Sequence, residues 1–586
     1  MNCLPLIFAA CLMACTSAMV TKGESKMPML KWAGKEKVVN HHNEVPFRVL
    51  ERKWGWGNCS QISIGHNCSQ ITNASAIGAR VPRDRAENMI IHGDNLAALK
   101  ALLPQYEGKV KCIYIDPPYN TGNEGWVYND NVNDPQIKKW LGEVVGKEGE
   151  DFSRHDKWLC MMYPRLRLLQ KLLSKDGVLW ISIGDDELAN LMLAMREIMG
   201  EPSGIFVWKS RSKPTNAGNA RYRPQKVTEY VLMYTKDKNK LFNIGSKNSE
   251  YSYPNQDADG NFRTTTILTS NLGSYKRETM RFSIGGYAPP QEKRWKAGKD
   301  KIEKLFLTNR LLMQPDGDPM EKVYDYDDDT MLTPMYTLID SKISGTAESG
   351  KTLLNQVIGK GHGFDTVKPV ELIEYLIGLS TDKDSLVLDS FAGSGTTAHA
   401  VLKMNAEDGG NRKFILVELM DYAETVTAER VKRVIDGYGD GDKVVEGTGG
   451  GFGYYELGEP LMIGENINED LPLEKIREYV WYMETRGMGG ARSCATATET
   501  AALHTDAVNF VPPVNDPYLL GIVDGTAYYF CFEKEKVVKL NRALLRKLKT
   551  KAERYVIYAD ICLLGEKELE KYNITFKKIP RDIARL

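Results

Sequence analysis

Two short apolar runs, each with an acidic residue at its end, most constrain how this chain can fold. Val110–Ile115 is followed by Asp116, and Leu386–Asp389 carries its own acid. Apolar runs of this length, bounded by turn residues and separated by helix-like patterns, predict the buried strands of a doubly wound α/β fold. Ligands of such sheets bind at the carboxyl ends of the strands. The residues that follow the two runs therefore define the candidate site.

The same periodicity gives the other expected elements of the sheet. We expect strands at residues 89–92, 110–115, 177–183, 205–208, 229–234, 386–389 and 415–418. We expect helices at residues 96–103, 159–173, 187–199 and 398–404. The two acid-ended runs are about 270 residues apart in the chain, but the alternation allows them to converge at one edge of the sheet.

A rigid corner follows the first run, formed by Asp116, Pro117, Pro118 and Tyr119. Each proline fixes its own φ near about −65° and lacks an N–H, and a residue before proline is held extended. The Asp116 carboxylate and the Pro117 carbonyl then suit the two hydrogens of an exocyclic NH2 group. The Tyr119 ring offers a flat face to a base that has left its stack. From these four residues alone, the alternative is a strand that ends in a Pro-Pro turn.

A glycine-rich turn follows the second run. Phe391, Gly393, Gly395 and Thr396 precede a helix-like segment, and two glycines permit a tight turn and close approach of a ligand to the backbone. Glu418 ends another apolar run, 25 residues after Gly393. An acid about 20 residues beyond such a turn is placed to bind the hydroxyls of a ribose. The pattern predicts a nucleoside cofactor.

Further short motifs accompany these two, and all fall in one order along the chain. They are Leu30-Lys31-Trp32-Ala33-Gly34-Lys35, His92-Gly93-Asp94-Asn95-Leu96, Asp116-Pro117-Pro118-Tyr119-Asn120-Thr121-Gly122, Trp180-Ile181-Ser182-Ile183, Lys368-Pro369 and Phe391-Ala392-Gly393-Ser394-Gly395. From about Leu30 to its end the chain resembles the modification subunits of type III restriction systems, a permuted group of DNA amino-methyltransferases in which the catalytic tetrapeptide precedes the cofactor glycines. One difference is Thr366-Val367, where the family usually has an aromatic residue and a proline.

The resemblance implies a circularly permuted, mainly parallel, Rossmann-like methyltransferase sheet and S-adenosylmethionine as the cofactor, with no metal. It assigns catalysis to Asp116, Pro117, Pro118 and Tyr119. It assigns cofactor binding to Asp94, Lys368, Pro369, Asp389, Phe391, Gly393, Gly395, Thr396 and Glu418. For Asp94, a helix N-cap is an equally good interpretation.

The reaction implied is methylation of adenine N6 in double-stranded DNA, on a target base flipped out of the helix. The partners implied are a second copy of the chain and a separate helicase-nuclease subunit, with no membrane. Three alternatives remain open: cytosine-N4 methylation, which uses the same NH2 chemistry, a specificity subunit that binds DNA without catalysis, and a methyltransferase that acts alone without a restriction partner. Asp at position 116, where Ser is the other option, favours adenine by resemblance.

Basic residues are concentrated in one stretch of an otherwise neutral chain. Residues 201–310 hold 21 Lys and Arg against 10 Asp and Glu, a net charge of +11, whereas the whole chain has a net charge of zero. Local phosphate contact requires such a region, although a solvated, loop-rich face has the same composition. By resemblance, residues 240–345 form a target-recognition region between two parts of the methyltransferase domain, residues 30–239 and 346–448.

The two ends of the chain lead to different expectations. Residues 1–29 are expected to be a non-native or disordered extension, because their apolar run has no preceding Lys or Arg, as a secretory signal requires. Residues 449–586 are expected to form an α+β domain for dimerisation or scaffolding, with helices at 473–483 and 541–555 and strands at 527–532 and 555–559. Ten cysteines without CxxC pairs indicate neither zinc nor disulfides and fit the cytoplasm.

Residues 345–352 satisfy the phosphate-loop pattern GxxxxGK[ST]. A nucleotide site of this kind also needs a buried strand directly before the loop and an acid-ended strand for magnesium. The segment 341–344 is not an apolar strand. We therefore interpret residues 345–352 as a linker and expect ATP-driven cleavage to reside in a separate chain.

Overall fold

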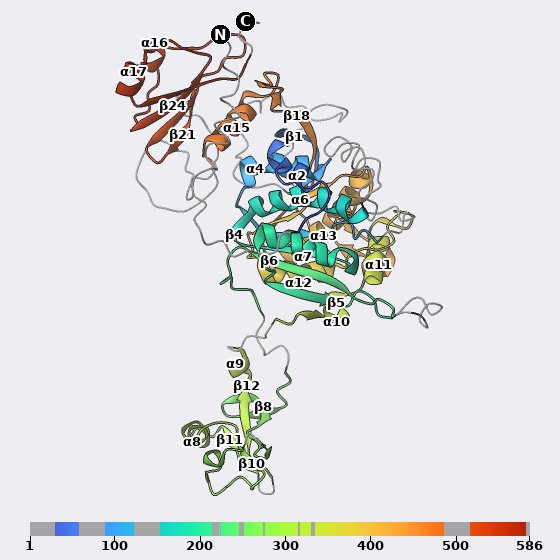
Figure 1. The fold of residues 1–586 in the computed structure, drawn as a ribbon. Coiled ribbons are helices and arrows are strands. Elements are labelled where there is room, and N and C mark those ends of the chain that lie inside the picture. Colours follow the sequence, from blue (N-terminus) through green and yellow to red (C-terminus); the bar gives the residue numbers. More distant parts are fainter. Residues whose placement is uncertain are drawn as a thin grey trace, which may run out of the picture.

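The computed structural model describes residues 30–57, 88–121, 153–213, 222, 224–244, 251–273, 276–314, 317–329, 335–485 and 516–581. The extension expected at residues 1–29 lies outside these ranges. Figure 1 shows a large α/β unit between a small unit that contains β8–β12 and a C-terminal unit that contains β21 and β24. No helix among these residues is long and apolar enough to cross a bilayer.

A ten-stranded sheet forms the centre of the large unit. Its strands run in the order β1 (Arg48–Gly57), β18 (Gly451–Pro460), β2 (Met89–His92), β15 (Lys413–Glu418), β14 (Leu386–Asp389), β3 (Val110–Ile115), β4 (Leu173–Ile183), β6 (Glu229–Thr235), β5 (Gly204–Trp208) and β13 (Leu338–Ile339). The six strands from β18 to β4 are parallel, and β6 is antiparallel to both of its neighbours. In this order, the late strands β18, β15 and β14 lie between strands from the first part of the chain. The predicted doubly wound, permuted fold is confirmed.

Helices cover both faces of the sheet (Figure 1). One face carries α4 (Asn95–Tyr106), α6 (Arg154–Leu172) and α7 (Asp185–Met199). The other carries α11 (Ala347–Ile358), α12 (Val370–Ser380), α13 (Thr396–Asp408) and α14 (Glu429–Asp436). Successive strand residues serve opposite cores, since Ile91 and Ile113 pack in the first and Ile90 and Cys112 in the second.

The small unit has its own sheet and core. Its strands are β7 (Asn255–Asp257), β8 (Gly260–Thr266), β12 (Met320–Tyr324) and β11 (Leu311–Leu312), with a separate pair of β9 (Leu268–Ser270) and β10 (Lys293–Trp295). Trp295 is fully buried against α8 (Lys299–Leu307) and its neighbours. The unit lies inside the stretch expected at 240–345, but β13 and α10 (Ser341–Ser344) return to the large unit. The insertion therefore ends before residue 338.

The C-terminal unit is shorter than the expected 449–586, because β18 belongs to the main sheet. It contains β21 (Leu519–Val523), β22 (Thr526–Phe530), β24 (Arg554–Ala559), β26 (Ile574–Lys578) and α17 (Glu566–Lys571). The helix expected at 473–483 is α15 (Leu473–Thr485). The remaining elements are α2 (Lys35–Val38), α3 (His41–Glu44), η4 (Glu278–Met280), α9 (Asp325–Asp329), η5 (Ala423–Ala428), β16 (Gly437–Tyr438), η6 (Gly441–Lys443), β17 (Val445–Glu446), β19 (Met462–Ile463), β20 (Asn466–Ile467), β23 (Lys539–Leu540), α16 (Arg542–Leu545) and β25 (Ile561–Cys562).

The helix expected at 541–555 is wrong, since α16 ends at Leu545 and β24 begins at Arg554. A longer helix would place Arg546 and Lys549 at a spacing of i,i+3, where like charges repel. The buried Asp516 carboxylate also accepts hydrogen bonds from the backbone N–H groups of Lys549, at 3.0 Å, and Thr550, at 3.2 Å. This long-range contact holds the chain outside a helix.

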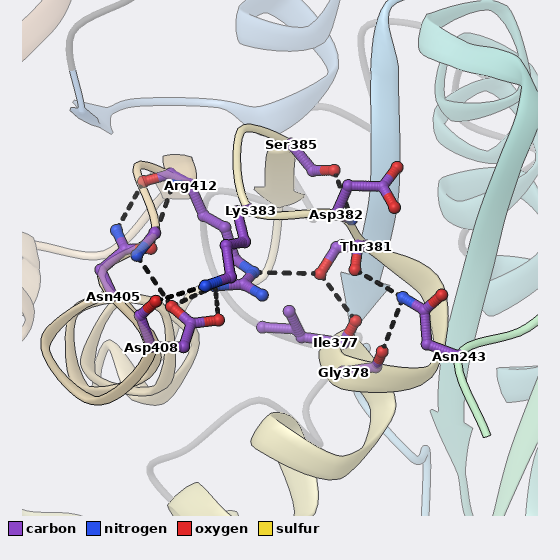
Figure 2. Close-up of polar contacts among 11 residues, drawn as sticks. Asn243, Ile377, Gly378, Thr381, Asp382, Lys383, Ser385, Asn405, Asp408 and Arg412 are labelled. Atoms are coloured by element: carbon purple, nitrogen blue, oxygen red, sulfur yellow. Dashed lines mark hydrogen bonds and ion pairs between the residues drawn. The ribbon is translucent and has the colours of Figure 1, made fainter. Parts of the chain in front are cut away.

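A polar cluster joins the loops before β14 and β15, at the amino ends of the strands (Figure 2). Arg412 is 5% exposed; its Nη1 donates to both oxygens of Asp408, at 3.1 and 2.9 Å, and its Nε donates to Thr381 Oγ1 at 3.2 Å. The Asn405 side chain binds the Arg412 backbone at both its N–H and its carbonyl. The cluster therefore fixes the amino ends of β14 and β15, at the opposite edge of the sheet from their carboxyl ends.

We expect Arg412→Ala to destabilise the large unit by about 1–3 kcal/mol, because it removes charge-assisted bonds from a buried site. The measurement is chemical unfolding followed by tryptophan fluorescence. Lys383→Ala is the matched control, since the Lys383 ammonium is exposed and, among the residues that the structure describes, donates only to the Asp408 carbonyl, at 2.5 Å. Equal stability of the two variants would contradict a structural role of the Arg412 cluster.

Candidate active site

The proline corner and the glycine turn meet at the carboxyl edge of the sheet. Strands β3 and β14 are parallel neighbours with Ile113 opposite Leu388, so their ends lie side by side. Side chains complete the connection: Thr396 Oγ1 donates to the Lys368 carbonyl at 3.3 Å, and Lys368 Nζ donates to Asp116 Oδ2 at 2.9 Å. Segments that are far apart in the chain thus form one site.

The corner itself is held by α6. The Trp158 indole N–H donates to the Pro118 carbonyl at 2.7 Å, and Arg154 Nη1 donates to the Asn120 carbonyl at 2.9 Å. Asn120 has a φ of +55°, which is uncommon for a residue other than glycine, and its side-chain amide returns a bond to the Arg154 carbonyl at 3.1 Å. These bonds fix the backbone of the corner directly after Asp116.

The two oxygens of Asp116 have different environments. Oδ2 forms the ion pair with Lys368, whereas Oδ1 is buried and accepts no hydrogen bond from the described residues. Burial raises the pKa of Asp116, and the positive charge of Lys368 opposes this rise. A buried acceptor without a donor is costly, so Oδ1 is suited to receive an N–H from a bound molecule.

Glu229 completes the polar group around Asp116, and sequence reasoning missed it. Glu229 Oε2 accepts the Tyr119 hydroxyl at 2.9 Å and lies 3.4 Å from Lys368 Nζ. Lys368 Nζ also lies 5.0 Å from the centre of the Tyr119 ring. Burial lowers the pKa of Lys368, but Asp116 and Glu229 outweigh this effect and raise it above its usual value. The only sequence signal of Glu229 is an acid at the start of a buried strand.

Backbone conformation explains the glycines of the turn. Gly393 and Gly395 have φ values of +51° and +78°, which favour glycine. A Cβ on Gly395 would lie 3.2 Å from the Thr427 carbonyl oxygen. Thr427 Oγ1 donates to the Gly393 carbonyl at 2.6 Å, which anchors the turn to the segment after Glu418.

Glu418 lies at the end of β15, next to the turn, as expected. Its Oε2 accepts the Gly393 N–H at 2.8 Å, and Oε1 accepts the Met420 N–H at 3.1 Å and the Tyr422 hydroxyl at 3.0 Å. Burial raises the pKa of Glu418 to about 6, although these donors oppose the rise. These bonds tie the carboxylate to the backbone of the glycine turn and to the segment after β15.

Asp389 is buried under the glycine turn and accepts hydrogen bonds from it. Its Oδ1 accepts the Phe391 N–H at 3.0 Å, and its Oδ2 accepts the Thr397 hydroxyl at 2.5 Å. The side chain is 2% exposed, and burial raises its pKa to about 7. Asp389 therefore holds the strand-to-helix turn closed, and a direct contact with a cofactor stays a prediction.

Asp94 forms the N-cap of α4, since its side chain accepts the Ala97 N–H at 2.9 Å. Arg165 Nη2 donates to its other oxygen at 2.8 Å. Next to it, the Asn95 amide donates to the Ser390 carbonyl at 3.0 Å, so the loop after β2 lies beside the glycine turn. The N-cap interpretation is confirmed, and a role in binding adenosine stays a prediction.

Pro369 is the N-cap residue of α12, which places Lys368 at the entrance of that helix. The pattern at 345–352 contributes to this placement: Thr346 caps α11, and a Cβ on Gly350 would lie 2.3 Å from the Val367 carbonyl oxygen. The glycine thus allows α11 to approach the backbone before Lys368. Lys351 forms an ion pair with Asp365 at 3.1 Å. This part of the chain packs as a helix against the site.

The described residues contain no group of three or more His, Cys, Asp or Glu side chains that could hold a metal ion. The site is instead built from carboxylates, one lysine, an aromatic ring and bare backbone. Glycine backbone beside a buried acid suits a nucleoside, and a buried, unpaired carboxylate oxygen suits an amine. The donor set therefore fits S-adenosylmethionine beside an amino-group acceptor.

Fold and site together define a Rossmann-like methyltransferase domain. A family model described as DNA methylase matches residues 110–429, which is more than half of the chain. The chain therefore belongs to the DNA methylase family.

Named relatives agree with this family. The chain is 35% identical over 355 residues to the type III restriction-modification enzyme StyLTI Mod subunit of Salmonella typhimurium, covering 56% of this chain and 52% of that protein. It is 32% identical over 377 residues to the EcoPI Mod subunit of Escherichia phage P1, covering 57% of each. It is 30% identical over 407 residues to the type II methyltransferase M.KpnI of Klebsiella pneumoniae, covering 65% of this chain and 89% of that protein. The chain thus spans just over half the length of the type III relatives.

Proposed function

We propose that this chain transfers a methyl group from S-adenosylmethionine to N6 of adenine in double-stranded DNA, as the modification and specificity subunit of a type III restriction system. The observation that carries the proposal is the Asp116 carboxylate, whose Oδ1 is buried without a donor while Oδ2 is paired with Lys368. Similarity to StyLTI Mod and EcoPI Mod supports the type III assignment.

The amine of adenine is a poor nucleophile, because its lone pair is delocalised into the ring. Asp116 and the Pro117 carbonyl accept its two hydrogens and orient the nitrogen, and the carboxylate stabilises the positive charge that grows there. Lys368 keeps Asp116 ionised, and the Tyr119 ring stacks on the base. These four residues therefore position the nucleophile.

S-adenosylmethionine supplies the electrophile, a methyl group on a sulfonium. Phe391, Gly393, Gly395 and Thr396 of the turn would hold it, with Glu418 at the ribose. Asp94, Pro369 and Asp389 would complete the wall of this pocket. Lys368 was expected to border the methionine end, but its ammonium lies on Asp116 and Glu229, so we assign it to the amine side.

Recognition of the DNA sequence is assigned to the small unit. Arg310 and Lys293 are used within it, in ion pairs with Asp327 at 2.7 Å and Asp318 at 2.5 Å. Lys276 likewise pairs with Glu278 at 3.2 Å, and Lys296 Nζ donates to the Thr266 carbonyl at 2.6 Å. Other basic side chains of this unit are exposed and can reach phosphates or base edges, namely Arg277, Lys299, Lys301 and Lys304. We further propose a homodimer through the C-terminal unit, a separate helicase-nuclease subunit, a flipped target base and action in the cytoplasm, as the resemblance of the sequence motifs to the family implies.

Nucleoside mass spectrometry tests the proposal. The full-length protein is incubated with unmethylated genomic DNA and methyl-labelled cofactor, and the DNA is digested to nucleosides. Labelled N6-methyladenine is the expected product. Labelled N4-methylcytosine would establish the first alternative, and cofactor binding without any labelled base would contradict the proposed reaction and favour a specificity subunit.

A further inference from the structure

We propose that Glu229 is a positioning residue of the active site, which orients Tyr119 and shares the Lys368 ammonium with Asp116. This inference rests on the proposed function. Glu229 belongs to β6, which is part of neither the proline corner nor the glycine turn.

Topology explains why Glu229 reaches the site. Strand β6 is antiparallel to β4, with Tyr230 opposite Ile183, so the first residue of β6 lies at the carboxyl end of β4. The proline corner lies at the same edge, because β3 and β4 are parallel. The Glu229 side chain is 22% exposed, so its bonds form in a partly desolvated place. The one antiparallel strand within this part of the sheet thus delivers a carboxylate to the carboxyl edge.

Glu229 and a glycine together determine the position of the Tyr119 ring. The Tyr119 hydroxyl donates to Glu229 Oε2 at 2.9 Å. At the other end of the side chain, a Cβ on Gly184 would lie 3.0 Å from Tyr119 Cδ2 and 3.6 Å from its Cβ. The ring is therefore held at its hydroxyl, and the glycine leaves the room that the ring needs beside the backbone. A stacking surface needs such restraint, because a shift of about 1 Å can cost about 100-fold in rate.

Glu229 also sets how strongly Lys368 binds Asp116. The ammonium lies 2.9 Å from Asp116 Oδ2 and 3.4 Å from Glu229 Oε2, so two carboxylates share one positive charge. Without Glu229 the ammonium would neutralise Asp116 alone and weaken it as an acceptor. Without Lys368 the negative charge of Glu229 would act on Asp116 unopposed, which would raise the pKa of Asp116 further. The trio therefore keeps Asp116 ionised but only partly paired.

The test is the pH dependence of single-turnover methylation by the full-length protein. Activity requires ionised Asp116, so it falls as pH drops through the apparent pKa of this carboxyl. Glu229→Gln removes a neighbouring negative charge and is expected to move this acidic limb to lower pH, with a rate at the plateau about 10-fold to 100-fold lower. Lys368→Met removes the opposing charge and is expected to move the limb to higher pH.

Two further variants separate positioning from charge. Glu229→Asp keeps the charge but withdraws it from the Tyr119 hydroxyl, so the rate should fall with a smaller shift of the limb than in Glu229→Gln. The double variant Tyr119→Phe/Glu229→Gln should lose less than the product of the two single losses, because they break one bond. Glu484→Gln is the matched control: Glu484 Oε1 accepts the Tyr558 hydroxyl at 2.5 Å and Lys577 Nζ at 2.7 Å, away from the site.

The inference would be overturned if Glu229→Gln lost activity at the same pH as the wild type on the acidic side and had a plateau rate within twofold of the wild-type rate. A wild-type protein that methylates no base would instead overturn the proposed function, so the two failures are distinguishable. Should Glu229→Gln lose cooperative unfolding, Glu229→Asp and Tyr119→Phe carry the test. Equal plateau rates of wild type and both of these variants would then overturn the inference.

Discussion

Asp116→Ala is expected to lose methyl transfer by at least about 100-fold to 1,000-fold, the usual cost of removing one preorganised polar group from the reacting centre. The loss follows because the variant has no carboxylate to accept the amine hydrogen or to stabilise its positive charge. The fold should persist, because Lys368 retains Glu229 at 3.4 Å as a partner. The measurement is single-turnover transfer of labelled methyl groups to DNA, together with calorimetric titration of the cofactor.

Cofactor affinity of Asp116→Ala should stay within a few-fold of the wild type, because the glycine turn makes its bonds to Glu418 and Thr427. The matched control is Asp176→Ala. Like Asp116, Asp176 pairs with a lysine, which is Lys111 of β3. The Asp176 side chain is 54% exposed and lies at the amino end of that strand. Retained methylation by Asp116→Ala would remove this carboxylate from the reaction.

Glu418→Ala should have the second largest effect, on cofactor binding. The substitution removes the proposed ribose acceptor and leaves the N–H groups of Gly393 and Met420 without their acceptor. Bonds to a charged group contribute about 1.5–3 kcal/mol each, so a cofactor dissociation constant higher by about 100-fold to 1,000-fold is expected in calorimetry. The DNA binding that we propose for the small unit should be unaffected.

Two controls show how much of the loss of cofactor affinity is due to the Glu418 carboxylate. Glu424→Ala changes an exposed acid six residues further on and should bind the cofactor normally. Because the pKa of Glu418 is about 6, the ionised form is lost as pH falls through this value, and wild-type affinity should fall with it. Glu418→Gln should lack that part of the pH dependence. An unchanged affinity in Glu418→Ala would assign the ribose to another group.

The central strands were predictable because burial acts locally on the sequence. Strands β2, β3 and β14 have the expected bounds, residue for residue, since each is an apolar run between turn residues. The helix expected at 541–555 failed because a contact from Asp516, more than thirty residues earlier, determines the backbone there. Propensity and periodicity contain no information about such a contact.

The backbone geometry of the candidate site was predictable where a motif imposes it, as at Pro117 and Gly395. Glu229 could not be found in this way, because its partners Tyr119 and Lys368 are 110 residues before it and 139 residues after it. Lys368 was identified as a site residue, but its position on Asp116 depends on the packing of α11 and α12. Sequence thus indicates which edge of the sheet carries the candidate site, and only the fold shows which charges meet there.

A crystal structure of the full-length protein with a target duplex and a non-reactive cofactor analogue tests the central claim most directly. We expect the analogue against the Gly393–Gly395 backbone and Glu418, and a flipped adenine whose amine donates to Asp116 Oδ1 with Tyr119 against its ring. The account would be contradicted by an analogue bound elsewhere on the sheet, or by a target amine that makes no contact with Asp116.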